Sequence, residues 1–263
     1  MTRILVNSGG ISLSAKVDGA EGKPWLILSN SLAADLTMWD DQIELLTQTH
    51  RVLRYDTRGH GQSDAPDAHY GFPDLVADMV AVLDHFGAVR ADVLALSLGG
   101  MTALGLGLKH PDRVGRMVVC DARADAPAPF VTGWDDRIAA VSANGMQAIV
   151  TGTLARWFTA TCPPDVTERA AAMILATPVK GYIGCAYALK TLDYLKDLGR
   201  LGVPVLYICG AEDMGAPKEA MAAMAAATPQ SSLTILPGLA HIPNMEDPAA
   251  FATALTGWLG ATQ

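Results

Sequence analysis

Apolar residues along the chain follow patterns that are typical of strands and of helices. Short, mostly apolar runs predict strands that are covered on both faces, and the alternation of apolar and polar residues at 11–17 predicts a half-exposed strand. Apolar residues three and four positions apart predict helices. The strands are expected at 11–17, 25–28, 51–55, 91–96, 116–120, 204–209 and 232–236. The helices are expected at 38–46, 73–86, 98–109, 216–227 and 248–259. Strands that alternate with helices predict an α/β fold, with a mostly parallel sheet and helices on both faces.

The segment 124–195 interrupts this alternation. Its sequence pattern is typical of helices, it contains five prolines, and it has no convincing strand pattern. A loop of this length is uncommon in a compact domain, so we expect a helical insertion over the carboxyl edge of the sheet. The predicted organisation is a core of residues 1–123 and 196–263 with a helical cap (a lid) at 124–195.

Composition and charge exclude several classes of protein. Of the 263 residues, 50% are hydrophobic and 17% are charged, which excludes a disordered chain. A net charge of −8 and a pI near 5.1 argue against a sequence-independent nucleic-acid surface. We find no signal-peptide pattern, no long apolar run and no metal-ligand spacing among the cysteines, so we expect a cytoplasmic protein without a membrane segment or metal.

The segment Ala95-Leu96-Ser97-Leu98-Gly99 is the first candidate for chemistry. A predicted buried strand runs into a serine between small residues and then directly into a helix. A nucleophile elbow needs this arrangement, because the serine occupies a strained turn. The usual pattern is G-x-S-x-G, and Ala95 replaces its first glycine with one extra methyl group. The alternative interpretation of Ser97 is a helix N-cap.

A nucleophilic serine needs a base that is itself oriented by an acid. His241 is the one histidine after Ser97 that lies in a predicted strand-end turn, and Asp213 follows the strand at 204–209. Both positions face the crevice above the carboxyl edge of an open sheet. Asp121 and Glu212 are alternative acids, and we favour Asp213. His60 is expected to pack in a glycine turn; His50 and His85 are expected at the surface or at helix ends.

An oxyanion hole requires two backbone N–H groups that point at the developing alkoxide. The first is expected from Leu98, directly after the serine. The second is expected from Leu32, because Asn30 and Ser31 stand where this fold usually has histidine and glycine before the donor.

These residues resemble the α/β-hydrolase superfamily and, more narrowly, the 3-oxoadipate enol-lactonases, over nearly the whole chain. The similar segments are SNSL at 29–32, RYDTRGHGQS at 54–63, WDDRI at 134–138, ARWFT at 155–159 and GYIGC at 181–185. The resemblance implies a helical cap, a Ser/Asp/His triad, no cofactor and hydrolysis of a lactone ester. Two segments depart from the lactonases: the elbow at Ala95, and residues 121–127, where an asparagine/threonine-rich stretch is expected.

The expected activity is that of a serine hydrolase that cleaves a small lactone or carboxylic ester. The serine at the elbow argues against related dehalogenases and epoxide hydrolases, which use an aspartate there. Arg137 and Arg156 are candidates to bind a substrate carboxylate, although solvated surface arginines are an equal alternative. Trp134 and Trp157 belong to an aromatic-rich cap that is expected to keep the pocket dry. A general small-acyl carboxylesterase, another lactonase and a ligand-binding receptor on the same fold remain alternatives.

Overall fold

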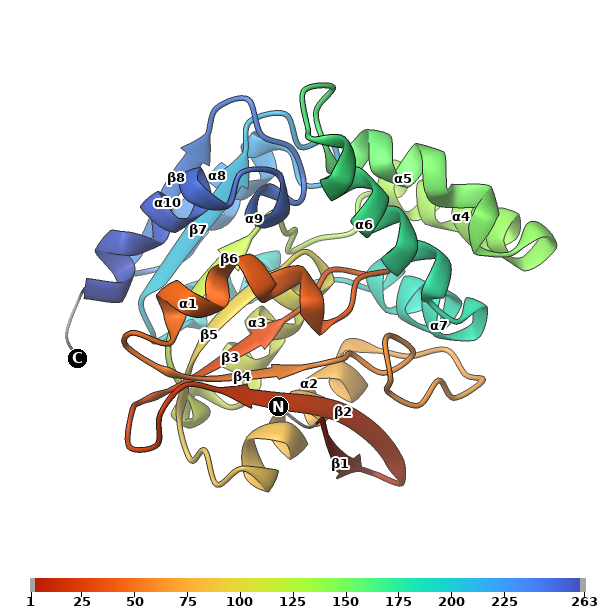
Figure 1. Ribbon diagram of the computed structural model, residues 1–263. Helices are drawn as coiled ribbons and strands as arrows, with labels where there is room; N and C mark the ends of the chain where they lie inside the picture. The colour runs from red at the N-terminus through yellow and green to blue at the C-terminus, as the bar shows by residue number, and fades with distance from the viewer. Residues whose placement is uncertain (1–2, 261–263) are drawn as a thin grey trace.

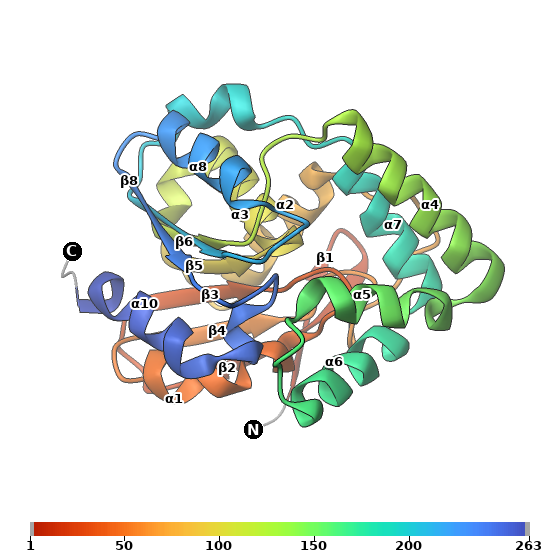
Figure 2. The same cartoon turned by 90° about the horizontal axis from the view of Figure 1, so that it is seen from above.

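A twisted sheet separates two layers of helices in the computed structural model, which describes residues 3–260 (Figures 1 and 2). The strands are β1 (Ile4–Ser8), β2 (Ile11–Asp18), β3 (Trp25–Ser29), β4 (Arg51–Tyr55), β5 (Ala91–Leu96), β6 (Val114–Cys120), β7 (Val205–Gly210) and β8 (Ser231–Leu236). Their order across the sheet is β1-β2-β4-β3-β5-β6-β7-β8. The β1–β2 and β2–β4 pairs are antiparallel and the other pairs are parallel, so the predicted mostly parallel sheet is confirmed.

The core helices cover both faces of the sheet. On one face lie α2 (Phe72–His85), α3 (Leu98–Lys109) and α8 (Lys218–Ala227), as Figure 2 shows. On the other face lie α1 (Ile43–Leu46) and α10 (Pro248–Gly260), preceded by the short α9 (Pro243–Glu246). All six residues of β5 and of β7 are buried; both sequences are mostly apolar, and Asp92 is the one charged residue in β5.

The cap consists of α4 (Ala128–Asn144), the 3₁₀ turn η3 (Met146–Ile149), α5 (Val150–Trp157), α6 (Pro164–Ala176) and α7 (Val179–Lys190). It extends from one end of the sheet (Figure 1). The chain enters and leaves it side by side, since the N–H groups of Tyr194 and Leu195 both donate to the Ala124 carbonyl oxygen. The inserted helical cap expected from the sequence is present.

The cap is seated on the core at a contact between two glycines. Gly181 of α7 lies so close to Gly59 that a Cβ added to Gly181 would come within 2.1 Å of the Gly59 carbonyl oxygen. Gly59 has a φ of +80°, a conformation that favours glycine. Glycine at both positions therefore allows the cap and core backbones to touch.

Three local predictions fail. The strand β1 was missed; its apolar run Ile4-Leu5-Val6 is short, and as an antiparallel edge strand it leaves Leu5 64% exposed rather than buried. The helix expected at 38–46 is instead the 3₁₀ helix η1 (Leu36–Gln42) followed by α1. A tertiary contact overrides the helix there, because the Met38 carbonyl accepts a hydrogen bond from Asn244 Nδ2. His50 is buried rather than superficial, with Nε2 3.3 Å from Asp92 Oδ2.

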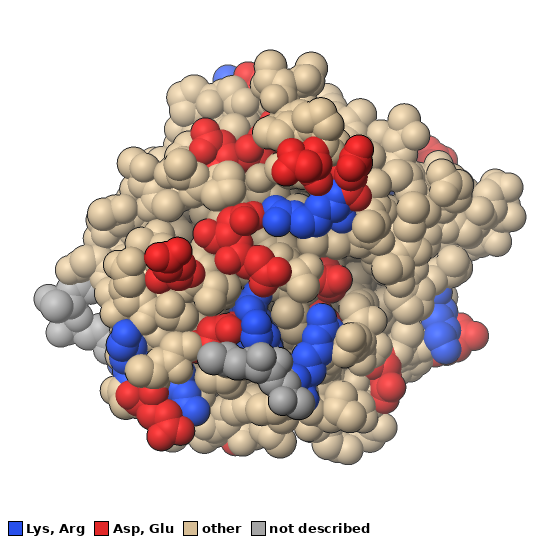
Figure 3. Space-filling model, in the orientation of Figure 1, with Lys and Arg blue, Asp and Glu red and all other residues tan. Residues whose placement is uncertain are grey.

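One face of the molecule carries widely spaced charges (Figure 3). On the face seen in Figure 3, acidic and basic side chains lie beside one another, separated by large uncharged areas. Among residues 3–260, no single helix is long and apolar enough to cross a membrane; α6 and α7 meet that test only as a pair bent by 96°.

Candidate active site

Ser97 stands in the sharp turn between β5 and α3. Its φ of 55° and ψ of −118° lie outside the regions that L-residues favour, and its N–H donates to the Cys120 carbonyl oxygen at 2.9 Å. Gly99 is obligatory for this turn, because a Cβ there would lie 2.4 Å from the Ser29 carbonyl oxygen. Ala95 fits as a fully buried residue. Ser97 occupies the N-cap position of α3, but within residues 3–260 its side chain makes no capping hydrogen bond, so capping is not the role of its hydroxyl.

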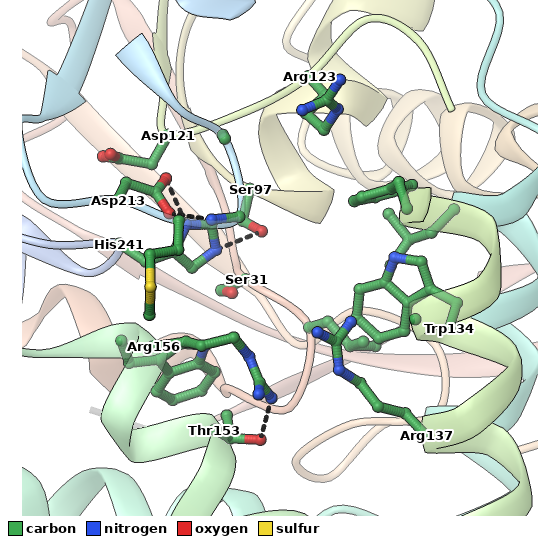
Figure 4. A pocket seen from close by; sticks show the side chains of 18 of the residues that line it. Ser31, Ser97, Asp121, Arg123, Trp134, Arg137, Thr153, Arg156, Asp213 and His241 are labelled. Carbon is green, nitrogen blue, oxygen red and sulfur yellow. Dashed lines mark hydrogen bonds and ion pairs between the residues drawn. The ribbon is translucent and has the colours of Figure 1, made fainter. Parts of the chain in front are cut away.

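The Ser97 hydroxyl is instead joined to His241 and Asp213 in a continuous chain. Ser97 Oγ lies 2.9 Å from His241 Nε2, and His241 Nδ1 lies 2.7 Å from Asp213 Oδ2 (Figure 4). The carboxylate accepts the Nδ1–H, which leaves Nε2 free to accept the serine proton. Residues from the elbow, the turn after β7 and the loop after β8 thus meet at the carboxyl edge of the sheet, as the sequence predicts.

Asp213 is held as an anion. Burial opposes its ionisation, but the His241 ring and the N–H groups of Gly215 and Ala216 outweigh burial and lower the pKa of Asp213. Its Oδ1 accepts the Gly215 N–H at 2.7 Å. Of the three acids left open by the sequence, Glu212 is exposed and Asp121 is buried nearby, but Asp213 is the acid hydrogen-bonded to His241.

Three side chains of the site could also hold a metal ion, because their ligand atoms lie within 4.8 Å of one another: Asp121, Asp213 and His241. Two ligands of one tetrahedral zinc ion stand about 3.3 Å apart. The 2.7 Å separation of His241 Nδ1 and Asp213 Oδ2 is that of a charge-assisted hydrogen bond. This geometry fits a hydrogen-bonded pair better than a pair of metal ligands.

The N–H groups of Leu32 and Leu98 are available to bind a ligand. Three neighbouring N–H groups are occupied: Ser31 donates to Met38 Sδ, Ala33 to His60 Nε2 and Gly99 to the Asn30 carbonyl oxygen. Leu32 and Leu98 have no acceptor for their N–H groups within residues 3–260. These are the two donors that the sequence analysis selected for the oxyanion hole.

His60 fixes the loop that ends in Leu32, a role that the sequence did not reveal. The ring is fully buried in the glycine turn, as expected, and its Nδ1–H donates to the Arg58 carbonyl oxygen. Its Nε2 accepts the Ala33 N–H at 2.9 Å. Burial, opposed by the bond to Arg58, lowers the pKa of His60 to about 4, so the ring is neutral and both ring nitrogens are bonded.

A cavity of about 330 Å³ opens in front of Ser97, between core and cap. Its volume is that of a small-molecule site. Four of the seven cap aromatics line it: Phe130, Trp134, Trp157 and Tyr182. The others pack elsewhere: Phe158 is buried, Tyr187 stacks on His69 and Tyr194 packs against Phe72. Sequence reasoning missed several further lining residues, among them Arg123, Thr153 and Met214. Of these three, only Arg123 could have been suspected from the sequence, because it stands three positions after the end of a predicted strand.

Arg137 and Arg156 both line the cavity, and Figure 4 shows their guanidinium groups pointing into it toward each other. Arg137 lies over the Trp134 ring at 4.5 Å, and Arg156 donates to Thr153 Oγ1 at 3.3 Å. Burial and then the charge of Arg137 lower the pKa of Arg156. Neither arginine has a carboxylate within ion-pair distance among residues 3–260, whereas Arg123 is paired with Asp125. Two guanidinium groups that converge without a carboxylate partner among the described residues can bind an anion.

The geometry of the fold and the elbow has counterparts among known proteins. The family model of the alpha/beta hydrolase fold matches residues 24–248. The chain belongs to the α/β-hydrolase family. This hydrolase is 32% identical to 3-oxoadipate enol-lactonase 2 of Acinetobacter baylyi, over 93% of this chain and 92% of the relative.

Two solved structures resemble this hydrolase over nearly their whole length. A hydrolase from Pseudomonas aeruginosa superposes with a TM-score of 0.93 and 38% identity, covering 98% of each chain. The enol-lactonase from Burkholderia xenovorans superposes with a TM-score of 0.94 and 32% identity, covering 98% of this chain and 100% of that one. The resemblance to enol-lactonases inferred from sequence motifs is confirmed.

Proposed function

We propose that this hydrolase opens a small lactone, or cleaves a small carboxylic ester, that carries a free carboxylate, through an acyl-enzyme on Ser97. The observation that carries the proposal is the chain Ser97–His241–Asp213 at one side of a cavity whose other side presents Arg137 and Arg156. A nucleophile with its base and an anion site thus face the same small volume.

The hydrogen bonds specify a role for each group. Ser97 Oγ attacks the ester carbonyl while His241 Nε2 removes its proton, and Asp213 stabilises the imidazolium. The Leu32 and Leu98 N–H groups stabilise the oxyanion. His241 then returns the proton to the leaving oxygen, which in a lactone stays attached to the acyl chain. Water activated by His241 finally releases the acid product and restores Ser97.

The opposite wall of the cavity supports this substrate class. Guanidinium groups bind carboxylates through charge-assisted hydrogen bonds, which gain strength where water is excluded. The rings of Trp134 and Trp157 supply apolar contacts beside Arg137 and Arg156. Similarity to 3-oxoadipate enol-lactonase supports a lactone as the reacting group.

A matched panel tests this function. Each lactone or ester is offered as the free acid and as its methyl ester, to the wild type and to the Ser97→Ala variant. We expect turnover by the wild type, preference for the free acid in kcat/KM, and loss of turnover in the variant. Equal kcat/KM for acid and methyl ester would identify a general carboxylesterase. Stoichiometric reaction without turnover across the panel would identify a receptor.

A further inference from the structure

A second buried carboxyl group, Asp121, lies beside the acid of the triad. It follows β6, is fully buried and has a φ of +45°. Its N–H donates to the Ile208 carbonyl oxygen at 2.9 Å, and its Oδ1 accepts the Gly210 N–H at 2.7 Å. Its Oδ2 is buried without a hydrogen-bond partner among the contacts of residues 3–260. An ionised oxygen in that position would be desolvated with nothing to compensate it.

The charges around Asp121 disfavour its ionisation. Asp213 comes from the turn after β7 and His241 from the loop after β8, and their ligand atoms lie within 4.8 Å of an Asp121 oxygen. Glu246 of α9 adds a further negative charge, and the buried thiols of Cys120 and Cys209 are neighbours on the strands. No basic side chain forms an ion pair with Asp121 among the described residues. Two buried carboxylates that share one site disfavour each other's ionisation, and the pKa of one of them is raised.

The hydrogen bonds decide which of the two carries the proton. Asp213 accepts from His241 Nδ1 and from the Gly215 N–H, and both donors stabilise an anion. Within residues 3–260, Asp121 accepts only from the Gly210 N–H. Consistent with this, burial and then the charge of Asp213 raise the pKa of Asp121 well above its usual range, while the pKa of Asp213 is lowered.

We infer that Asp121 is a positioning residue that stays protonated and donates a hydrogen bond from its Oδ2–H to the Asp213 carboxylate. The inference rests on the proposed function, because it concerns how Asp213 serves His241. The three groups then carry a charge of −1 at rest and 0 when His241 holds the serine proton. The donated bond holds the Asp213 carboxylate toward Nδ1 without placing a second anion beside the ring.

Two substitutions separate this role from a purely structural one. Asp121→Asn keeps the shape, and its amide can both accept from Gly210 and donate to Asp213. Asp121→Ala loses both bonds. We expect the Asn variant to keep kcat within about threefold and the acid limb of the kcat/KM profile within about 0.3 pH unit. We expect the Ala variant to lose about 10-fold to 100-fold in kcat at unchanged KM, as losses of supporting hydrogen bonds do, with its acid limb displaced upward.

An infrared measurement reads the proton without turnover. At neutral pH the wild type should show the C=O band of a buried protonated carboxyl group, which Asp121→Asn removes. The same band is expected in Ser97→Ala, so failure of the serine mechanism would not hide the result.

Absence of the band, or an acid limb about one pH unit lower in Asp121→Asn, would show that Asp121 is ionised. An unchanged kcat and limb in Asp121→Ala would remove the positioning role. Activity that survives Asp213→Asn but not Asp121→Asn would make Asp121 the acid for His241.

Discussion

The neutral ring of His60 accepts the Ala33 N–H at 2.9 Å and so holds in place the loop that presents the Leu32 N–H to the cavity. His60 and Ala33 are buried, and the opposite ring nitrogen is tied to the Arg58 carbonyl. Protonation of the ring would convert its acceptor nitrogen into a donor facing another N–H. The loop around the oxyanion donor therefore depends on an uncharged histidine.

This bond predicts a loss of stability in mild acid. His60 has a pKa near 4 in the folded protein, and an unfolded histidine has its usual value of 6.5, so between these values the unfolded chain binds the extra proton. Stability due to this group is present above pH 6.5 and falls as the pH approaches 4. From about pH 7 to about pH 5 the loss attributable to His60 is about 2 kcal/mol.

The contribution of His60 to this loss of stability is measured by urea unfolding at about pH 7 and about pH 5. The proteins compared are the wild type, His60→Gln and His85→Gln. The wild type and the control His85→Gln, which alters an exposed histidine, should lose equal stability on acidification. His60→Gln should lose about 2 kcal/mol less. An equal loss in all three proteins would contradict a neutral His60.

The unpaired arginines predict a selective effect on acidic substrates. Replacing Arg137 or Arg156 with glutamine removes a charge-assisted bond worth roughly 10-fold to 100-fold in affinity. We expect KM for a carboxylate-bearing substrate to rise by that factor, with kcat/KM for its methyl ester nearly unchanged. Arg123→Gln is the matched control, since Arg123 lines the same cavity but is paired with Asp125. Equal losses for acid and methyl ester would refute the anion site.

The strained backbone at Ser97 predicts an opposition between stability and activity. Strain at a positive φ costs about 1–3 kcal/mol in a non-glycine residue, and part of this is offset because glycine is more flexible when unfolded. Ser97→Gly should therefore be more stable than Ser97→Ala by about 1 kcal/mol, although both lack the hydroxyl. Chemical unfolding of the two variants measures the difference, and a less stable glycine variant would contradict strain at the elbow.

The contact between Gly59 and Gly181 predicts where the cap tolerates no side chain. Gly181→Ala places a Cβ against the Gly59 backbone and should destabilise the protein by at least 1–3 kcal/mol, roughly the cost of overpacking. In Gly257→Ala of α10 the added Cβ meets no atom of residues 3–260 within 4 Å, and the substitution should stabilise the protein by about 0.5–1 kcal/mol, because alanine is the better helix former. Thermal unfolding of both variants measures the contrast. Similar shifts in the two variants would mean that the cap does not rest on this contact.

The fold was predictable wherever burial imposes a pattern on the sequence. The central strands β5 and β7 are buried throughout, so their residues are apolar apart from Asp92 of β5 and Gly210 of β7. The edge strand β1 exposes Leu5 and takes its stability from pairing with β2, and η1 takes its shape from a bond between Met38 and Asn244. Such partners are far apart in the sequence, so no local pattern records them.

In the site, too, local sequence patterns were predictive, and contacts between residues far apart in the sequence were not. Ser97, Asp213 and His241 follow strands, and parallel strands bring their carboxyl ends together, so local pattern alone predicted that they would meet. The bond from Gly210 to Asp121 spans 89 positions and the bond from Ala33 to His60 spans 27. Each of these depends on the relative placement of two elements, which single residues and their spacing do not encode.

Trapping the acyl-enzyme tests the central claim most directly. The hydrolase is mixed with a carboxylate-bearing lactone, quenched in acid within the first turnover, digested and examined by mass spectrometry. The account predicts that the peptide containing Ser97 gains the mass of the opened lactone, that the gain is located on Ser97, and that Ser97→Ala shows neither adduct nor turnover. Turnover at the wild-type rate in Ser97→Ala, or an adduct on another residue, would contradict it.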